Sequence, residues 1–298
     1  MSKPAVHRSG FVNIIGNPNV GKSTLMNALV GERLSIVTSK AQTTRHRIMG
    51  IVNGDDYQIV YSDTPGILRP SYRLQERMMD SVDTAIGDAD IILYVTDVIE
   101  SGEKNIEYIE KLQRINVPTL LVINKIDLSN QHDLEQLTAQ WRALLPNAEI
   151  FPASALEKFN LDNLFNRVVA LLPPSPPWYD KEVFTDRNLR FFASEIIREK
   201  ILLNYSKEIP YCTEVVIEGF KEEEELYRIE AIIHVMRDSQ KGILIGSQGS
   251  KLKRVGTQAR KDMETFFERK VFLQLFVKVA PNWREDKRRL KQFGYVEG

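Results

Sequence analysis

The chain has 298 residues, of which 43% are hydrophobic and 27% charged, with 40 basic and 40 acidic side chains. This length exceeds one ordinary core and accommodates two globular domains. A single cysteine, Cys212, excludes an internal disulfide framework, and four scattered histidines form no zinc-binding pattern. Because the sequence shows neither a secretory signal nor an apolar run approaching the roughly 18 residues that cross a bilayer, we expect a cytoplasmic protein.

The zero net charge hides an uneven distribution along the chain. Residues 1–180 carry 17 basic and 21 acidic side chains, whereas residues 181–298 carry 23 and 19. Within the second part, residues 237–291 hold 15 basic and 6 acidic side chains. A local excess of positive charge in a neutral chain is typical of a polyanion site, and also of an ordinary solvated face.

In the first half, short apolar runs alternate with segments of helical spacing. The runs predict strands buried on both faces, over residues 11–15, 57–63, 91–97 and 119–125. Helices are predicted over residues 22–30, 72–85, 102–115 and 134–144. The Asn53-Gly54 pair predicts a turn between two antiparallel strands. The alternation therefore indicates an α/β domain, whose mostly parallel sheet has one antiparallel edge strand.

Segment 173–180, with four prolines among its first five residues, predicts a stiff extended linker. The alternative is a long loop inside one domain. We therefore expect one domain over residues 1–175 and a second, smaller α+β domain over residues 176–298. In the second domain we predict a helix, two strands, two helices separated by a break at 246–249, a strand and a basic helix. Their ranges are 191–205, 212–220, 226–236, the residues up to 246, 250–268, 271–279 and 284–293.

The sequence GNPNVGKS lies between the first predicted strand and the first predicted helix, where a P-loop is required. Its glycines let backbone N–H groups surround a phosphate, and the helix N-terminus adds a positive dipole end. We expect Lys22 to reach the β- and γ-phosphates and Ser23 to bind Mg²⁺. The expected phosphate-binding residues are Gly16, Asn17, Pro18, Asn19, Val20, Gly21, Lys22, Ser23 and Thr24.

The sequence NKID follows a later strand and selects guanine over adenine. A carboxylate at Asp127 accepts hydrogen bonds from the ring N–H and the exocyclic amine of guanine, and adenine offers neither. Backbone amides after the next apolar segment would meet the guanine oxygen. The expected base-binding residues are Asn124, Lys125, Asp127, Ser154, Ala155 and Leu156.

Two further segments are expected to respond to the γ-phosphate. The DTPG sequence, Asp63, Thr64, Pro65 and Gly66, would place Asp63 in the Mg²⁺ shell and the Gly66 amide at the γ-phosphate. A threonine hydroxyl in the preceding polar loop would complete that shell only while the γ-phosphate is bound, which makes the loop a switch. We prefer Thr44, with Thr43 as the alternative. The switch I residues are Gln42, Thr43, Thr44, Arg45 and His46.

The ordered set GNPNVGKS, QTTRH, DTPG, NKID and SAL resembles the translation-factor-related class of small bacterial GTPases. FFASEIIREKI followed by GILIGSQGSKLKRVG is similar to the Era family, whose second domain is a type II KH fold. The resemblance extends over essentially the whole chain. It implies a GTP-hydrolysing switch that binds the 3′ end of small-subunit ribosomal RNA during small-subunit assembly. It also implies peripheral contact with the inner face of the membrane.

Within the basic stretch, GSQG joins two predicted helices. Glycines at this spacing allow the backbone to approach about four nucleotides closely, although GxxG alone is also an ordinary helix–helix turn. The basic helix at the C-terminal end is the next candidate for RNA binding. With the Era resemblance, the expected RNA-binding residues are Lys241, Ile245, Gly246, Ser247, Gln248, Gly249, Lys251, Lys253 and Arg254.

The residue after DTPG is Ile67, where many GTPases have a glutamine that orients the attacking water. We therefore expect slow hydrolysis, arranged by the backbone, other side chains, a monovalent cation or a partner. Asn19 occupies the position at which related GTPases coordinate K⁺, so a K⁺ site is an open expectation. Two alternatives remain, a P-loop ATP-dependent kinase of a small molecule and a non-catalytic RNA-binding assembly protein.

Overall fold

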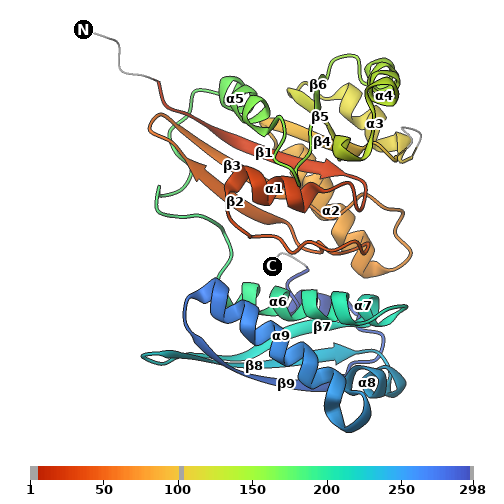
Figure 1. The fold of residues 1–298 in the computed structure, drawn as a ribbon, viewed down its shortest axis with the longest axis vertical. Helices are drawn as coiled ribbons and strands as arrows, with labels where there is room; N and C mark the ends of the chain where they lie inside the picture. Colours follow the sequence, from red (N-terminus) through yellow and green to blue (C-terminus); the bar gives the residue numbers. More distant parts are fainter. Residues whose placement is uncertain (1–5, 101–103, 296–298) are drawn as a thin grey trace. The chain divides into compact units, whose positions relative to one another are not determined.

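The computed structural model describes residues 6–100 and 104–295. They form two compact units, each with its own sheet (Figure 1). The first unit comprises the chain through Val37, Thr44–Pro70 and Met78–Asp186. The second comprises Thr38–Thr43, Ser71–Arg77 and the chain from Arg187 onward. Two short segments from the first half of the sequence thus belong to the second unit.

The first unit is built on a six-stranded sheet in the order β2-β3-β1-β4-β5-β6. Its strands are β1 (Arg8–Gly16), β2 (Ile48–Asn53), β3 (Tyr57–Asp63), β4 (Ile91–Asp97), β5 (Thr119–Asn124) and β6 (Glu149–Pro152). Every neighbouring pair is parallel except β2 and β3, so the predicted antiparallel edge hairpin is confirmed. All seven residues of β4 are buried, as expected of an apolar strand in the middle of a covered sheet.

Helices cover both faces of this sheet (Figure 1). They are α1 (Lys22–Val30), α2 (Arg73–Gly87), α3 (Ile106–Arg114), α4 (Gln131–Leu144) and α5 (Leu161–Leu171). The helix predicted over 102–115 begins at Ile106, and the first two of its predicted residues lie outside the described part of the chain. Parallel strands joined by helices bring their carboxyl ends to one edge, where open α/β sheets bind ligands.

The proline-rich segment lies along the first unit in an extended form. The backbone N–H of Ser175 donates to the carbonyl oxygen of His7 at 3.1 Å, and the ring of Trp178 packs against Phe11 with centroids 5.3 Å apart. The side-chain oxygen of Gln58 accepts from the backbone N–H groups of Trp178 and Tyr179 at 2.7 and 3.0 Å. Missing amide donors and a fixed φ suit the prolines to an extended segment outside the hydrogen-bonding ladder of the sheet. The domain boundary near residue 175 stays a prediction.

The second unit is a three-stranded sheet with helices packed against it. Its elements are α6 (Leu189–Asn204), α7 (Ile209–Cys212), β7 (Glu214–Glu222), β8 (Leu226–Val235), α8 (Asp238–Ile245), α9 (Ser250–Phe267), β9 (Lys270–Val279) and α10 (Lys287–Gln292). β8 is central, antiparallel to β7 and parallel to β9. This is the predicted α+β unit. The terminal helix starts later than predicted because the Asp286 side chain caps it, accepting from the N–H groups of Arg288 and Arg289.

Along residues 6–100 and 104–295, no helix combines the length and apolarity needed to cross a bilayer.

Candidate functional site

The predicted phosphate-binding residues, Gly16 through Thr24, occupy the end of β1, the loop that follows and the first turn of α1. At Gly16 the backbone passes so close to β4 that a Cβ would lie 2.1 Å from the carbonyl oxygen of Val95, so only glycine fits. α1 begins at Lys22, and its first N–H groups face the loop without helical partners. Those groups and the helix dipole make this loop a site for an anion.

Lys22 reaches back over the loop that precedes it. Its Nζ donates to the carbonyl oxygens of Gly16 and Asn17 at 3.1 and 2.9 Å, and the side chain is buried. Burial lowers the pKa of Lys22 to about 8, although the carboxylates of Asp63 and Glu100 act in the opposite direction. A phosphate in the loop would stabilise the ammonium form, because it places negative charge against a desolvated cation.

Three oxygen-bearing side chains meet beside Lys22. Ser23 Oγ lies 2.7 Å from Asp63 Oδ2 and 2.9 Å from Thr44 Oγ1, and Thr44 Oγ1 lies 3.2 Å from the same carboxylate oxygen. The other oxygen of Asp63 is buried and accepts no hydrogen bond within the described part of the chain. Burial raises the pKa of Asp63, which Lys22 opposes. Two hydroxyls and a buried carboxylate are the donor set that Mg²⁺ prefers.

The DTPG segment is fixed directly against the P-loop. The backbone N–H of Ile67 donates to the carbonyl oxygen of Gly16 at 3.1 Å, and Thr64 Oγ1 donates to the carbonyl oxygen of Ile14 at 2.7 Å. A Cβ on Gly66 would lie 2.7 Å from the Cα of Pro18. The Ile67 side chain is apolar and only 1% exposed, so it offers no group to a water molecule. Any contact of Gly66 or Ile67 with the γ-phosphate or the attacking water must therefore come from the main chain.

The predicted base-binding residues converge at the carboxyl ends of β5 and β6. Asn124 Nδ2 donates to the carbonyl oxygen of Val20 at 2.8 Å, and its Oδ1 accepts from the N–H of Ala155 at 2.9 Å. Ser154 Oγ donates to Asp127 Oδ1 at 2.6 Å and orients an otherwise exposed carboxylate. Leu156 is 73% exposed beside them. Because Asp127 is exposed, its second carboxylate oxygen is the expected acceptor for a base.

The predicted switch I residues divide between the two units after Thr43. Thr44, Arg45 and His46 belong to the first unit, and Thr44 joins the cluster around Asp63. Thr43 belongs to the second unit, and its Oγ1 bonds Thr38 and the carbonyl oxygen of Lys40, each at 2.6 Å. This placement favours Thr44 over Thr43 as the metal ligand.

Within the second unit, the segment Thr38–Thr43 is attached to α6. Arg198 donates to the carbonyl oxygen of Thr43, and Lys40 Nζ donates to the carbonyl oxygens of Leu202 and Tyr205 at the end of α6. A lysine at the C-terminal end of a helix satisfies carbonyl groups that have no helical partner. The switch I segment is therefore held by specific contacts on the side that precedes Thr44.

Sequence reasoning missed three polar residues near the P-loop. Asp97 ends β4 and pairs with Lys125 at 2.6 Å, while Lys125 Nζ also donates to the carbonyl oxygen of Asn19 at 2.6 Å. Glu100 accepts from Asn17, which in turn accepts from Asn105. Burial raises the pKa of Glu100, against hydrogen bonds from Asn17 and Thr96. The position of Asp97 after a buried apolar strand was the available signal.

In the second unit, the predicted GxxG loop forms a tight turn between α8 and α9. Gly246 and Gly249 have φ of 73° and 76°, which favour glycine, and Gln248 has φ of 49°. Ser247 and Gln248 are exposed at its tip, whereas Ile245 packs against the core. Lys251, Lys253 and Arg254 are exposed on the first turns of α9, and Lys241 is half-buried on α8. The loop and its basic residues thus lie together.

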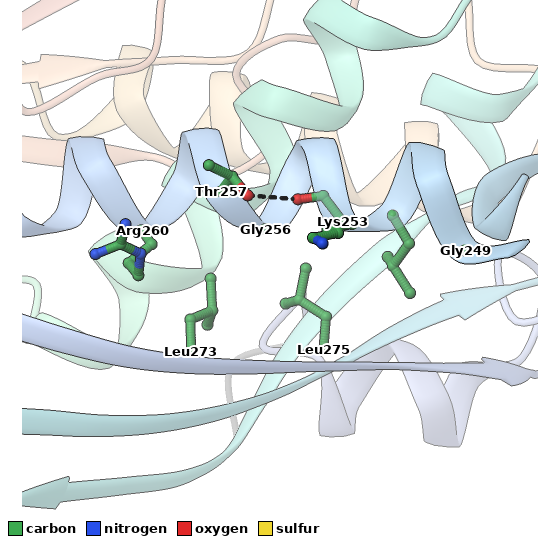
Figure 2. A pocket seen from close by; sticks show the side chains of 8 residues that line it. Gly249, Lys253, Gly256, Thr257, Arg260, Leu273 and Leu275 are labelled. Atoms are coloured by element: carbon green, nitrogen blue, oxygen red, sulfur yellow. Dashed lines mark hydrogen bonds between the residues drawn. The ribbon is translucent and has the colours of Figure 1, made fainter.

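A groove of about 370 Å³ continues from this loop between α9 and β9 (Figure 2). Leu273 and Leu275 point from β9 toward α9 and form an apolar floor (Figure 2). Gly256 faces this floor, and a Cβ there would lie 3.2 Å from Leu275 Cδ1. Beyond the predicted Gly249 and Lys253, the residues that line the groove are Leu252, Gly256, Thr257, Arg260, Leu273 and Leu275.

Comparison with protein-family models matches both units. Residues 11–125 match the model described as 50S ribosome-binding GTPase, and residues 208–284 match the KH domain model. The fold and its two sites thus define the class: a P-loop GTPase domain followed by a KH domain.

Relatives and solved structures narrow this class to one family. The chain is 46% identical to GTPase Era of Syntrophus aciditrophicus over 97% of this chain and 96% of the relative. It is 43% identical to GTPase Era of Staphylococcus epidermidis over 98% of each chain. The chain belongs to the GTPase Era family and hydrolyses GTP.

Two crystal structures of Era resemble the whole chain. One, in complex with MgGDPNP and nucleotides 1506–1542 of 16S ribosomal RNA, matches with a TM-score of 0.93 and 36% identity over 98% of this chain and 100% of the other. The second, an Aquifex aeolicus Era variant bound to GDP and AlF4⁻, has a TM-score of 0.93 and 37% identity over 97% of this chain and 100% of the other.

Proposed function

We propose that this GTPase binds the 3′ end of small-subunit ribosomal RNA through its KH unit and acts in assembly of the small ribosomal subunit. The groove between α9 and β9 is the observation that carries the proposal, because it combines an apolar floor, a GxxG loop and basic side chains. The Era of known structure that was crystallised with 16S ribosomal RNA supports the choice of RNA. We place this action in the cytoplasm. Peripheral membrane contact stays a prediction.

The shape of the groove suits a single strand rather than a duplex. Unstacked bases can lie against Leu273 and Leu275, which exclude water from one face of a base. Gly246 and Gly249 have no side chain, so phosphates can approach the loop backbone closely at these two positions. Lys251, Lys253 and Arg254, exposed at the same end, supply the charge for these phosphates.

On the nucleotide side, we propose that Ser23, Thr44 and Asp63 hold Mg²⁺ while Lys22 contacts the β- and γ-phosphates. An ion held by these residues would neutralise the charge that develops on the phosphates during hydrolysis. Asp127 selects guanine. Asn124 connects the P-loop to the base site, because it bonds the carbonyl oxygen of Val20 and the N–H of Ala155. Because Thr44 reaches Asp63 and Ser23 directly, its hydroxyl is the group that would respond to loss of the γ-phosphate.

We also propose a K⁺ ion beside Asn19. Asn19 is exposed at the P-loop with φ of 67°, and Lys125 holds its carbonyl oxygen from the base side. A monovalent cation there would supply positive charge at the phosphates, which the apolar side chain of Ile67 cannot do. Replacing KCl with NaCl at equal ionic strength should then lower the rate of GTP hydrolysis by the wild type. The rate of the Asn19→Ala variant should be the same in both salts.

RNA binding by the full-length protein tests the main proposal. We expect tight, salt-dependent binding of a single-stranded oligonucleotide with the sequence of the 16S 3′ end, measured by fluorescence anisotropy, and weaker binding of a scrambled sequence. Changing Ser247 and Gln248 to Asp places two carboxylates among the phosphates without altering either glycine. Each repulsive contact costs on the order of 1–3 kcal/mol, so the affinity should fall at least about tenfold.

A control variant with the same change in net charge shows whether the loss of RNA affinity depends on the position of the new carboxylates or only on the total charge. Gln136→Asp with Gln140→Asp alters two exposed positions of α4 in the first unit and should leave RNA affinity unchanged. Equal affinities for wild type and the Ser247/Gln248 variant in about 150 mM salt would place the RNA site elsewhere, with α10 as the next candidate.

A further inference from the structure

Asn17 is a P-loop residue whose side chain is built into the protein. It is only 1% exposed, and both ends of its amide are hydrogen-bonded. Nδ2 donates to Glu100 Oε1, and Oδ1 accepts from Asn105 Nδ2. The second carboxylate oxygen of Glu100 accepts from Thr96 Oγ1 at 3.2 Å, which fixes the carboxylate at the end of β4. A buried amide in this arrangement has a single favoured orientation.

Asn105 extends this chain of hydrogen bonds to the residue after DTPG. Its Nδ2 also lies 3.3 Å from the carbonyl oxygen of Ile67, so one amide group bridges the P-loop side chain and the Ile67 main chain. Asn105 precedes α3 with φ of 59°, a left-handed conformation that asparagine tolerates better than most residues. The backbone there is set so that the side chain faces both acceptors.

Because Ile67 stands where many GTPases have a glutamine, we expect the Gly66–Ile67 main chain to hold the attacking water. The Ile67 side chain has no polar group, whereas a glutamine at this place would hold the water itself. The remaining groups belong to the main chain, and their distance from the γ-phosphate depends on how this segment sits against the P-loop. On one side it is fixed by the Ile67 N–H, which donates to Gly16 at 3.1 Å. The Asn105 bridge fixes the carbonyl of the same residue.

We propose that Asn17, Asn105 and Glu100 form a positioning network for GTP hydrolysis, in which they hold the Gly66–Ile67 main chain at a fixed place relative to the P-loop. None of the three contacts the reacting atoms through the bonds described. Their effect passes through Ile67 to Gly66, whose backbone N–H is the group expected at the γ-phosphate. GDP lacks that phosphate, so the network matters for turnover and much less for GDP affinity.

The hydrogen-bond pattern of this network allows an isosteric test. Asn17→Asp keeps the acceptor for Asn105 but sets a second carboxylate against Glu100, where a donor is required. Adding Glu100→Gln restores a donor–acceptor pair, because the new amide can donate to the carboxylate introduced by Asn17→Asp and still accept from Thr96. The double variant also restores the original net charge.

Single-turnover hydrolysis of GTP by the full-length protein, with GDP affinity measured by fluorescent-nucleotide titration, tests the proposal. We expect Asn17→Asp and Asn105→Ala each to lower the hydrolysis rate about tenfold or more while GDP affinity stays within about threefold. The pair Asn17→Asp with Glu100→Gln should recover the rate to within about threefold of the wild type. Asn116→Ala, at an exposed asparagine beyond α3, serves as the matched control and should hydrolyse GTP at the wild-type rate.

Three results would overturn the proposal. One is a wild-type rate in Asn105→Ala. Another is failure of Glu100→Gln to improve hydrolysis by Asn17→Asp when both variants retain the wild-type melting temperature. The third is a parallel loss of GDP affinity and rate in the single variants, since that marks general damage to the P-loop.

Discussion

Ser154 Oγ donates a hydrogen bond to Asp127 Oδ1 over 2.6 Å, and this contact fixes the orientation of the exposed carboxylate that we propose as the acceptor for the base. Asp127→Asn should exchange guanine for xanthine specificity, because the amide can donate where the carboxylate accepted. Loss of two hydrogen bonds to a charged acceptor should reduce GTP affinity about a hundredfold or more, with a gain for xanthosine triphosphate. Asp55→Asn, at an exposed position, is the control. Unchanged GTP affinity in Asp127→Asn would remove this residue from the base site.

The low pKa of Lys22, about 8, makes nucleotide affinity pH-dependent. Phosphates bind the ammonium form, so GDP affinity should fall as pH rises through about 8, by at most about tenfold per pH unit. Lys22→Ala should bind more weakly throughout and lack this slope. The measurement is a titration of GDP at pH values between about 7 and 9. The same slope in both proteins would show that another group titrates.

Stability of the nucleotide-free protein should change with pH in the opposite direction. Between pH 8 and 10.5 the unfolded chain retains a proton on Lys22 that the folded chain has released. The unfolded state then binds more protons, so the free energy of unfolding rises with pH over this interval. In Lys22→Ala this contribution should be missing. Chemical denaturation at several pH values measures the difference, and a decrease for the wild type relative to Lys22→Ala contradicts the assignment.

Asp97 should matter for nucleotide binding through Lys125. Lys125 Nζ lies 2.6 Å from Asp97 Oδ2, and the side chains of Lys125 and Asp97 are 30% and 8% exposed. Solvent therefore screens this ion pair only in part. In a double-mutant cycle with Asp97→Asn and Lys125→Met, we expect a coupling of about 1–2 kcal/mol in GDP binding. Additive effects of the two changes would mean that Asp97 acts independently of Lys125. Its role would then be to accept hydrogen bonds from the backbone N–H groups of Ile99 and Glu100.

Gly66→Ala should separate GTP hydrolysis from GDP binding. The new Cβ would meet the Pro18 backbone at 2.7 Å, so the DTPG segment has to move away from the P-loop. Because GDP has no γ-phosphate, its affinity should change little, whereas hydrolysis should fall at least about tenfold. Gly87→Ala, where a Cβ meets nothing within 4 Å, is the matched control and should behave as the wild type. Normal hydrolysis in Gly66→Ala would show that this close approach is dispensable.

The architecture could be predicted from the sequence because the hydrophobic patterns and the motifs indicate the same strands, helices and turns. Apolar runs predicted β3 and β4 with the bounds observed, and the Asn53-Gly54 turn predicted the antiparallel edge. The P-loop and NKID each follow a strand of the parallel sheet, so the sequence alone predicted that the two motifs lie close together. The assignment of individual residues to nucleotide, metal and RNA stays a prediction for the experiments above.

Features that depend on tertiary contact could not be predicted in the same way. Asn105 meets Asn17 and Ile67 across 88 and 38 residues of sequence, and nothing local to Asn105 indicates that partner. The division of switch I after Thr43 likewise depends on Arg198 and Lys40, which bond across about 160 residues. The groove proposed for RNA requires β9 to bring Leu273 and Leu275 beside α9, whereas the sequence predicted only a strand over residues 271–279.

Gly256 gives the sharpest test of that groove. Its position on α9 faces Leu275, and a Cβ would lie 3.2 Å from Leu275 Cδ1, so a methyl group there enters the space proposed for a base. Gly256→Ala should lower the affinity for the 16S 3′-end oligonucleotide about tenfold and leave the salt dependence unchanged, because no charge is altered. GTP hydrolysis without RNA should stay the same.

Gly242→Ala on α8 is the control, since a Cβ there meets nothing within 4 Å. Both changes place alanine in a helix, which favours the folded state by up to about 1 kcal/mol, but the close contact with Leu275 opposes this gain at Gly256. The melting temperature of Gly256→Ala, compared with that of the wild type, therefore separates a local loss of RNA affinity from unfolding. If both variants bind RNA as tightly as the wild type, bases do not enter the groove at Gly256. Weaker binding by both would indicate an effect on the KH unit as a whole.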